Sequence, residues 1–179
     1  MDDSARRRLL LAGVAAGFAA AGAGIGWWRL RPSDARDDAA ALLLGATLND
    51  PSGQPVAIGR FAGKPLVVNF WATWCAPCVK EMPELARLRD AFAPRGIETL
   101  GVAIDAPSAV REFIARRPVS YPVVVGGLGG TELARAFGND TGALPFTVLL
   151  DAAGRIAWRH LGVVEPQALA AACEQVLRA

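Results

Sequence analysis

The sequence predicts an α/β domain with a central mixed β-sheet flanked by helices, an N-terminal β-hairpin extension, and a targeting or anchor segment before it. Two observations support this fold class. From Leu66 onward, short apolar runs of β-favouring residues alternate with segments of helical spacing, which implies parallel strands joined by crossovers. Near the end of the chain, two apolar runs flank the turn-forming residues 151–154, which predicts an antiparallel pair.

The first 28 residues resemble a targeting segment. Arginines at 6–8 precede an uncharged run over residues 9–28, which is long enough as a helix to cross a bilayer of about 30 Å. Arg-Arg followed by one residue and two leucines resembles a twin-arginine export signal. The basic start predicts that the rest of the chain lies outside the cytoplasm. Cleavage behind Ala35 and retention as a membrane anchor, with Trp27 and Trp28 at the interface, both remain open.

Residues 29–41 are polar, contain a proline and lack a sustained apolar period, so they are interpreted as a tether. The folded domain is expected over residues 42–179. Its first feature is a pair of apolar stretches, 46–48 and 55–58, separated by Asn-Asp-Pro-Ser-Gly-Gln, which predicts the hairpin.

The rest of the domain is predicted to alternate between strands and helices. The predicted strands are residues 66–71, 99–104, 119–125, 147–150 and 156–161. The predicted helices are residues 78–93, 108–116, 131–137 with Thr131 as the N-cap, and 165–177. The glycine-rich residues 126–130 lack the strand-then-helix fingerprint of a dinucleotide site and are interpreted as a loop.

Composition excludes several classes of function. A formal net charge of +2 offers no basic face for nucleic acid. Three cysteines are too few for a disulfide scaffold, and a metal site needs more convergent ligands than the single histidine, His160, suggests. We therefore expect no metal and no cofactor. Cys173 lies in an Ala-rich helical pattern, which is typical of a small buried apolar residue.

The chemistry is expected at Cys75 and Cys78, where a buried strand gives way to a helix. Residues three apart on a first helical turn bring their side chains to one side, close enough for a disulfide. The unpaired N–H groups and partial positive charge of a helix N-terminus stabilise a thiolate and lower its pKa below the free value of about 8.5. This arrangement favours a reversible dithiol.

The run Val-Val-Asn-Phe-Trp-Ala-Thr-Trp-Cys-Ala-Pro-Cys-Val-Lys-Glu-Met-Pro over residues 67–83 resembles the thioredoxin superfamily, specifically exported TlpA-type and cytochrome c maturation reductases. The resemblance covers residues 44–179 and implies the thioredoxin fold. It also implies that Cys75 is the exposed attacking thiolate and Cys78 the buried resolving thiol. Glu81 matches an acid near the resolving cysteine, and Asn69 stands where cytoplasmic thioredoxins have a buried aspartate. Proton transfer from Cys78 would then fall to Glu81.

A second stretch concerns substrate binding. Pro145 directly precedes an apolar strand, and only X–Pro bonds adopt the cis form with any ease. In the superfamily a cis-proline at this place lies beside the cysteines, and the residue before it pairs with bound peptide. The resemblance therefore implies that Leu144 and Pro145 bind substrate, together with Trp74, Ala76 and Pro77.

These expectations combine into an extracytoplasmic, periplasmic thiol-disulfide oxidoreductase that reduces disulfides in client proteins, with apocytochrome c as one candidate client. A membrane thiol-disulfide carrier would return electrons to it, and an uncleaved N-terminal segment would hold it at the inner membrane. Ala76 and Pro77 lack the histidine that strongly oxidising enzymes place between their cysteines, which favours a reductase. A disulfide-forming oxidase and a copper or metal chaperone on the same fold are the alternatives.

Overall fold

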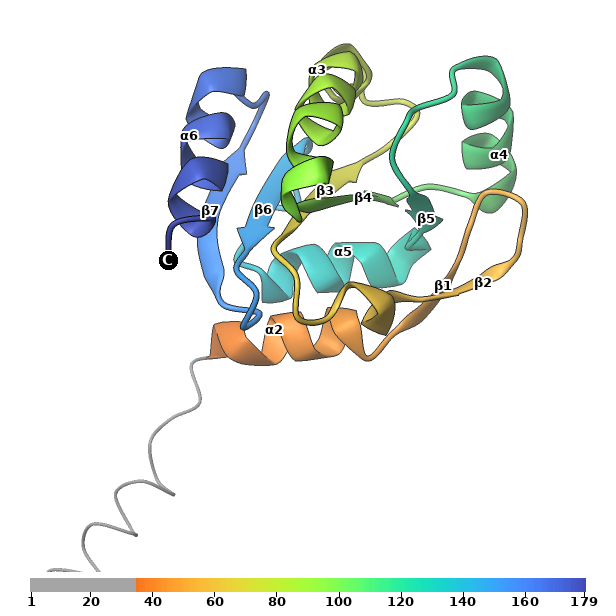
Figure 1. Cartoon of the computed structure of the whole chain (residues 1–179). Helices are drawn as coiled ribbons and strands as arrows, with labels where there is room; N and C mark the ends of the chain where they lie inside the picture. The colour runs from red at the N-terminus through yellow and green to blue at the C-terminus, as the bar shows by residue number, and fades with distance from the viewer. Residues whose placement is uncertain (1–34) are drawn as a thin grey trace, which may run out of the picture. The chain divides into compact units, whose positions relative to one another are not determined.

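The computed structural model describes residues 35–179 and shows a seven-stranded sheet in the order β2-β1-β5-β4-β3-β6-β7 (Figure 1). The strands are β1 Thr47–Asn49, β2 Pro55–Ala57, β3 Leu66–Trp71, β4 Glu98–Ala103, β5 Val123–Val125, β6 Phe146–Leu150 and β7 Ile156–Leu161. The helices are α2 Ala35–Leu44, α3 Ala76–Phe92, α4 Pro107–Arg116, α5 Gly127–Ala136 and α6 Pro166–Val176. Two short 3-10 helices, η1 Ile58–Phe61 and η2 Ala93–Arg95, complete the described elements.

The sheet is mixed, as the sequence predicts. Strand β3 pairs in parallel with β4 and antiparallel with β6, and β4 pairs in parallel with β5. Strand β7 adds antiparallel to β6, and the predicted hairpin β1–β2 joins the other edge through Asn49 and Val125. All six residues of β3 are buried, because helices cover both faces of the sheet at this strand.

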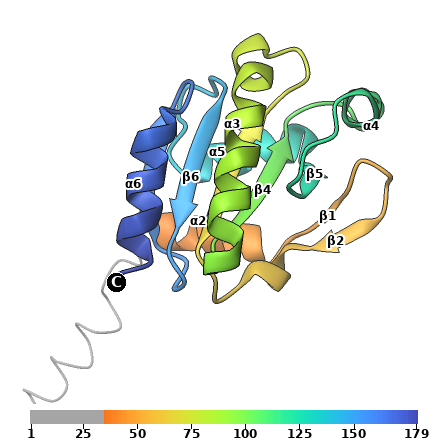
Figure 2. The ribbon, with the colours of Figure 1, turned by 45° about the horizontal axis from the view of Figure 1, so that its top comes forward.

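Alternating residues of β3 point into two separate cores. Val67 and Trp71 pack with residues of α3, α4 and α6 on one face, where α3 and α6 run side by side (Figure 2). Val68 and Phe70 pack with residues of α2 and α5 on the opposite face. Asn69 lies between Val67 and Trp71, so the pleat directs it toward α3, the helix that begins at the cysteines.

The predicted tether is wrong for residues 35–41, because they belong to helix α2. Ala39, Ala40 and Leu43 are almost completely buried against the α5 face of the sheet. Ala39 and Leu43 are four positions apart, which places them one above the other on a single helix face. The domain thus begins by Ala35, further toward the N-terminus than the polar composition of residues 29–41 suggested.

Two further boundaries differ from the prediction. Only residues 123–125 of the expected strand 119–125 pair as β5, since Pro122 has no N–H to donate to a ladder. Helix α5 begins at Gly127, so part of the predicted glycine loop is helical and Thr131 is not its N-cap. A Cβ at Gly126 would lie 2.9 Å from both the Gly130 Cα and the Val102 Cγ1, so glycine permits α5 to pack closely on β4.

The predicted targeting segment over residues 1–28 and the first part of the tether lie outside the described residues. Among residues 35–179, no helix combines the length and the apolar character required for a membrane span.

Candidate active site

The two cysteines lie on the turn that connects β3 to α3. Cys75 is the N-cap of α3, with extended backbone angles of φ −85° and ψ 94°, and Pro77 occupies its first turn. The two sulfurs form a disulfide, with 5.3 Å between the Cα atoms. The Cys78 N–H donates to the Cys75 Sγ at 3.3 Å, which is the contact of an N-cap side chain. A thiolate at Cys75 would therefore receive this hydrogen bond and the favourable field of the helix N-terminus.

Cys75 is less exposed than the family resemblance implied. Cys78 is completely buried, as expected of a resolving thiol, but Cys75 is only 5% exposed and so is not the openly accessible residue that the resemblance implied. The residues around it are more exposed: Trp74 is 70% accessible, and Ala76 and Pro77 are also exposed. In the disulfide form the surface presented to a partner is thus mainly Trp74, Ala76 and Pro77.

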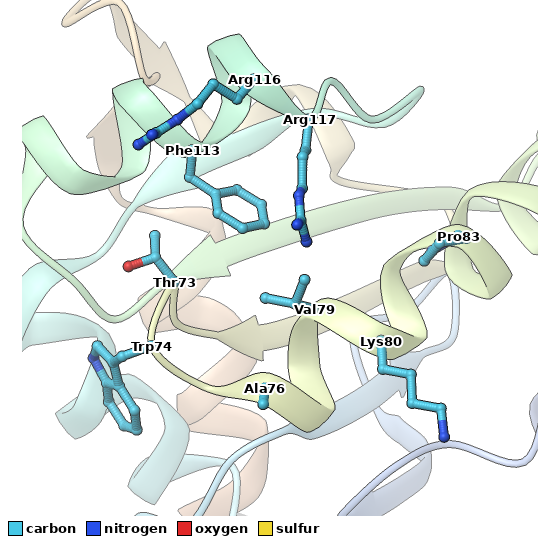
Figure 3. Close-up of a pocket in the computed structure, with 9 residues that line it drawn as sticks. All are labelled: Thr73, Trp74, Ala76, Val79, Lys80, Pro83, Phe113, Arg116 and Arg117. Atoms are coloured by element: carbon cyan, nitrogen blue, oxygen red, sulfur yellow. The ribbon is translucent and has the colours of Figure 1, made fainter.

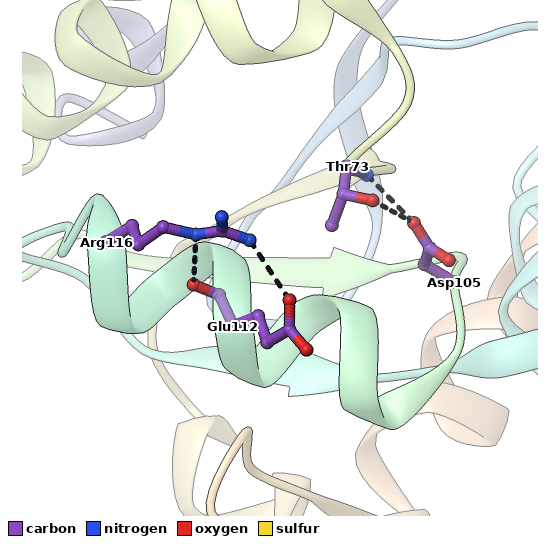
Figure 4. Close-up of polar contacts among 4 residues, drawn as sticks. All are labelled: Thr73, Asp105, Glu112 and Arg116. Atoms are coloured by element: carbon purple, nitrogen blue, oxygen red, sulfur yellow. Dashed lines mark hydrogen bonds and ion pairs between the residues drawn. The ribbon is translucent and has the colours of Figure 1, made fainter.

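A side-chain brace holds the turn from the next strand. Asp105, just after β4, accepts hydrogen bonds from the Thr73 N–H at 3.0 Å and the Thr73 hydroxyl at 2.6 Å (Figure 4). Its other carboxylate oxygen accepts from the Ala106 N–H at 2.7 Å, at the start of α4. Partial burial alone would raise the pKa of Asp105, but these hydrogen bonds outweigh it and lower the pKa below its ordinary value. Sequence reasoning missed this brace because its two residues lie on different elements.

The Leu144–Pro145 peptide bond is cis, as its sequence context predicted. Because β6 runs antiparallel to β3, the start of β6 lies beside the end of β3, and Phe146 pairs with Phe70. Pro145 is therefore brought to the same end of the sheet as the cysteine turn. Its carbonyl accepts from the Gly162 N–H at 2.8 Å, which ties this loop to the end of β7.

A buried polar network lies beneath the cysteines. Glu81 is 2% exposed, and one carboxylate oxygen accepts from the Asn69 Nδ2 while the other accepts from the Val164 N–H, both at 2.9 Å. The Asn69 Nδ2 also donates to the Thr147 hydroxyl at 2.9 Å, and Thr147 is the register partner of Asn69 across β3 and β6. Glu81 lies one helical turn after Cys78, the cysteine expected to act as the resolving thiol, so the network reaches from this turn of α3 to the centre of the sheet.

Burial dominates the ionisation of Glu81. Removal of the carboxylate from water raises the pKa of Glu81, and the hydrogen bonds from Val164 and Asn69 offset this only in part. A carboxyl group with a raised pKa beside a buried thiol is suited to accept and return a proton.

Cys173 is buried, as its sequence context predicted, and His160 makes local contacts. Cys173 is a free, completely buried cysteine, and burial raises the pKa of its thiol to about 12. The His160 ring stacks on Trp158 with 5.7 Å between centroids, and its Nε2 lies 3.1 Å from the Val163 carbonyl oxygen. His160 is thus held by local contacts at the end of β7.

An open cleft adjoins the cysteine turn between α3 and α4 (Figure 3). It measures about 700 Å³ and is bordered at one end by Trp74 and Ala76, two of the expected substrate-binding residues. Pro77, Leu144 and Pro145 do not line this cleft. Trp74 and Ala76 therefore border the cleft, Pro77 is exposed on the turn, Leu144 is half-buried, and Pro145 is buried.

Comparison with known proteins identifies the family. The family model described as Redoxin matches residues 37–177. The thiol-disulfide oxidoreductase ResA of Halalkalibacterium halodurans is 31% identical over 121 residues, which cover 67% of this chain and 66% of that protein. The ResA of Geobacillus thermodenitrificans is 32% identical over 122 residues, which cover 65% of this chain and 68% of that protein.

The chain thus spans about two thirds of the length of these relatives. A solved structure of a thiol:disulfide interchange protein of the thioredoxin family from Chlorobium tepidum superposes with a TM-score of 0.62. That protein is 27% identical and covers 74% of this chain and 92% of its own. The chain belongs to the redoxin family, and its domain has the thioredoxin fold.

Proposed function

We propose that this chain is a thiol-disulfide oxidoreductase that reduces disulfide bonds in client proteins outside the cytoplasm. The observation that supports this most directly is the Cys75–Cys78 disulfide at the first turn of α3, with the Cys78 N–H aimed at the Cys75 sulfur. The names of the ResA relatives and of the structural neighbour support thiol-disulfide exchange as the activity, whereas the reductive direction and the location rest on the sequence.

The reaction begins with the reduced dithiol. The Cys75 thiolate attacks one sulfur of a client disulfide, so that a Cys75–client disulfide forms and one client thiolate leaves. Cys78 then passes its proton toward Glu81 and attacks the Cys75 sulfur. The second client thiolate leaves and takes up the proton that Cys78 released, and the first client thiolate takes up a proton from solvent. The client gains two electrons and is released as a dithiol, while Cys75 and Cys78 return to the disulfide of this structure.

Client binding is assigned to the surface around Cys75. The exposed Trp74, Ala76 and Pro77 provide an apolar platform, and the backbone of Leu144 before the cis-proline offers strand-like pairing to an extended client. Apocytochrome c and a membrane thiol-disulfide carrier are the partners that the family resemblance suggests. The periplasmic location and attachment to the membrane rest on the sequence of residues 1–28.

A redox titration of the full-length chain tests the direction of electron flow. We expect Cys75 and Cys78 to have a reduction potential well below about −120 mV, the value of a strong disulfide-forming oxidant. A measured potential near that value would instead support the oxidase alternative. As a companion test, a Cys78→Ser variant should accumulate client proteins in disulfide linkage to Cys75, whereas a Cys75→Ser variant should not.

The metal-chaperone alternative gains no support from the geometry. Within residues 35–179, no cluster of three or more His, Cys, Asp or Glu side chains is arranged to hold a metal ion. His160, the residue on which that alternative depends, is engaged with Trp158 and Val163. Copper binding by the full-length chain that is lost in a His160→Ala variant would revive it.

A further inference from the structure

The cleft beside Trp74 is the first part of a longer groove between α3 and α4. A second hollow of about 450 Å³ lies further along α3 and reaches Asp90 and Ser120. The two hollows share four lining residues, Val79, Pro83, Phe113 and Arg117. They therefore form one groove, which we call the α3–α4 groove. It lies on a different side of the cysteine turn from the cis-proline loop, whose residues line neither hollow.

The length of the α3–α4 groove suits an extended polypeptide. Its lining residues on α3 extend from Ala76 to Asp90, a rise of about 21 Å along the helix axis. At about 3.3 Å per residue, an extended segment of about six residues would fill this length. The floor is apolar in the middle, where Val79 and Phe113 face each other across the groove (Figure 3).

The charge of the groove is positive near the cysteines. Lys80, Arg116 and Arg117 all line the part nearest Cys75. Arg116 is already paired with Glu112 at 3.1 Å, but within residues 35–179 Arg117 and Lys80 have no ion-pair partner.

Arg117 is the cation best placed to receive a ligand. Its side chain crosses the groove toward Val79, and its guanidinium carbon lies 5.9 Å from the centroid of the Phe113 ring (Figure 3). Contact with an aromatic face orients the planar guanidinium, which can then bind a carboxylate through two parallel hydrogen bonds. Lys80 points away from Arg117, along the outer side of α3 (Figure 3).

We propose that the α3–α4 groove binds an extended, acidic segment of the client protein, next to the client cysteine that Cys75 attacks, with a client carboxylate held by Arg117. This inference rests on the proposed function. Val79 lies four residues after Cys75, a rise of about 6 Å, which two residues of extended chain cover. The carboxylate is therefore expected about two positions from the client cysteine.

Symmetric peptide disulfides test the proposal with the full-length, reduced chain. Each peptide has a single cysteine with the same side chain two positions before and two positions after it, Glu in one peptide and Gln in the other. Two electrons pass from the Cys75–Cys78 dithiol to the peptide disulfide, which yields two peptide thiols that can be alkylated and separated by chromatography. We expect the Glu peptide to be reduced about fivefold faster than the Gln peptide, which is the effect of one exposed charge pair.

The variant Arg117→Gln should lose this preference and reduce the two peptides at equal rates, and reduction of both peptides shows that the fold and the dithiol are intact. The matched control is Arg135→Gln, which removes the same charge from α5 on the opposite face of the sheet and should keep the preference. Added salt should weaken the preference, because the pair is open to solvent.

The contrary outcomes separate this proposal from the proposed function. Equal rates for both peptides, or a preference that persists in Arg117→Gln, would overturn the groove proposal and leave the reductase intact. Failure to reduce either peptide would overturn both. Self-association of the chain that Arg117→Gln abolishes would assign the groove to a second copy and overturn the client proposal.

Discussion

Replacement of Glu81 by glutamine isolates the role of the buried carboxylate. The exchange preserves shape, and the surrounding network can accommodate it. The carbonyl oxygen of the introduced glutamine can still accept the hydrogen bond from the Val164 N–H. Its NH2 group can donate to the Asn69 Oδ1, which has no hydrogen-bond partner among the described residues. Rotation of the Asn69 amide makes this possible, and the Thr147 hydroxyl can then donate to the same oxygen. We therefore expect the Glu81→Gln variant to fold.

The stability of this variant should depend on pH in a defined direction. Because the pKa of Glu81 is raised in the folded state, the folded protein holds a proton that the unfolded chain has released. Wild-type stability is then full below the unfolded glutamate pKa of 4.5 and falls as the pH rises toward the folded pKa. Between these two pH values, the free energy of unfolding of the variant should rise relative to that of the wild type by up to about 1.4 kcal/mol for each pH unit.

Urea unfolding of both oxidised proteins across this pH range measures the gap, that is, the free energy of unfolding of Glu81→Gln minus that of the wild type. The control is Glu84→Gln, a change at a more exposed acid of α3 that pairs with Arg87, and it should show no widening gap. A Glu81→Gln gap that widens toward low pH would refute the reasoning, because it would mean that the hydrogen bonds from Val164 and Asn69 lower the pKa of Glu81 more than burial raises it.

The same variant tests the proposed proton transfer. Loss of a positioned acid–base group typically slows a step by about a hundredfold or more. In single-turnover reduction of a peptide disulfide, Glu81→Gln should leave the attack by Cys75 nearly unchanged and slow the release of the Cys75–peptide disulfide. Unchanged release across the pH range would exclude Glu81 as the group that receives the Cys78 proton.

Two further predictions concern the supports of the active-site turn and the packing of α5. Asp105→Ala removes the brace and should lower the free energy of unfolding by about 2 kcal/mol at neutral pH, a loss that shrinks below pH 3.8 because the pKa of Asp105 is lowered in the folded state. Glu112→Ala, at an exposed ion pair of α4, is the control and should change stability little (Figure 4). Gly126→Ala should destabilise by about 1–3 kcal/mol, because its Cβ would overlap its neighbours. At Gly129 an added Cβ would have no neighbour within 4 Å, so Gly129→Ala should stabilise α5 by up to about 1 kcal/mol. Urea unfolding measures both variants, and equal effects at the two glycines would contradict the packing argument.

Features encoded over a few adjacent residues could be predicted from the sequence. The position of Cys75 and Cys78 at the start of a helix follows from the change in hydrophobic period after Trp71. The cis bond before Pro145 follows from the proline at the start of a strand together with the family context. In both cases the information lies within a short local stretch of chain.

Features that depend on pairing between distant elements could not be predicted in this way. Thr73 and Asp105 are 32 residues apart, and only the parallel pairing of β3 with β4 brings them together. Helix α2 has its charged residues grouped at 36–38 and its leucines grouped at 42–44, so no helical period in the sequence separates a solvent face from a buried face, and residues 35–41 looked like part of a tether. Burial against α5 reveals its role, and that contact is tertiary.

The polar network under the cysteines lies between these two cases. Glu81 and Asn69 could be singled out because each stands at a motif position, but nothing in their local sequence indicates that they contact each other. The contact arises because the side chain of Asn69, two residues after Val67 in β3, points to the face that α3 covers, where Glu81 lies one turn beyond Cys78. An amide at position 69 donates to the carboxylate, whereas a second carboxylate would repel it. The hydrogen bond from Asn69 therefore favours the ionised form of the buried Glu81, which is the form that the proposed proton transfer from Cys78 requires.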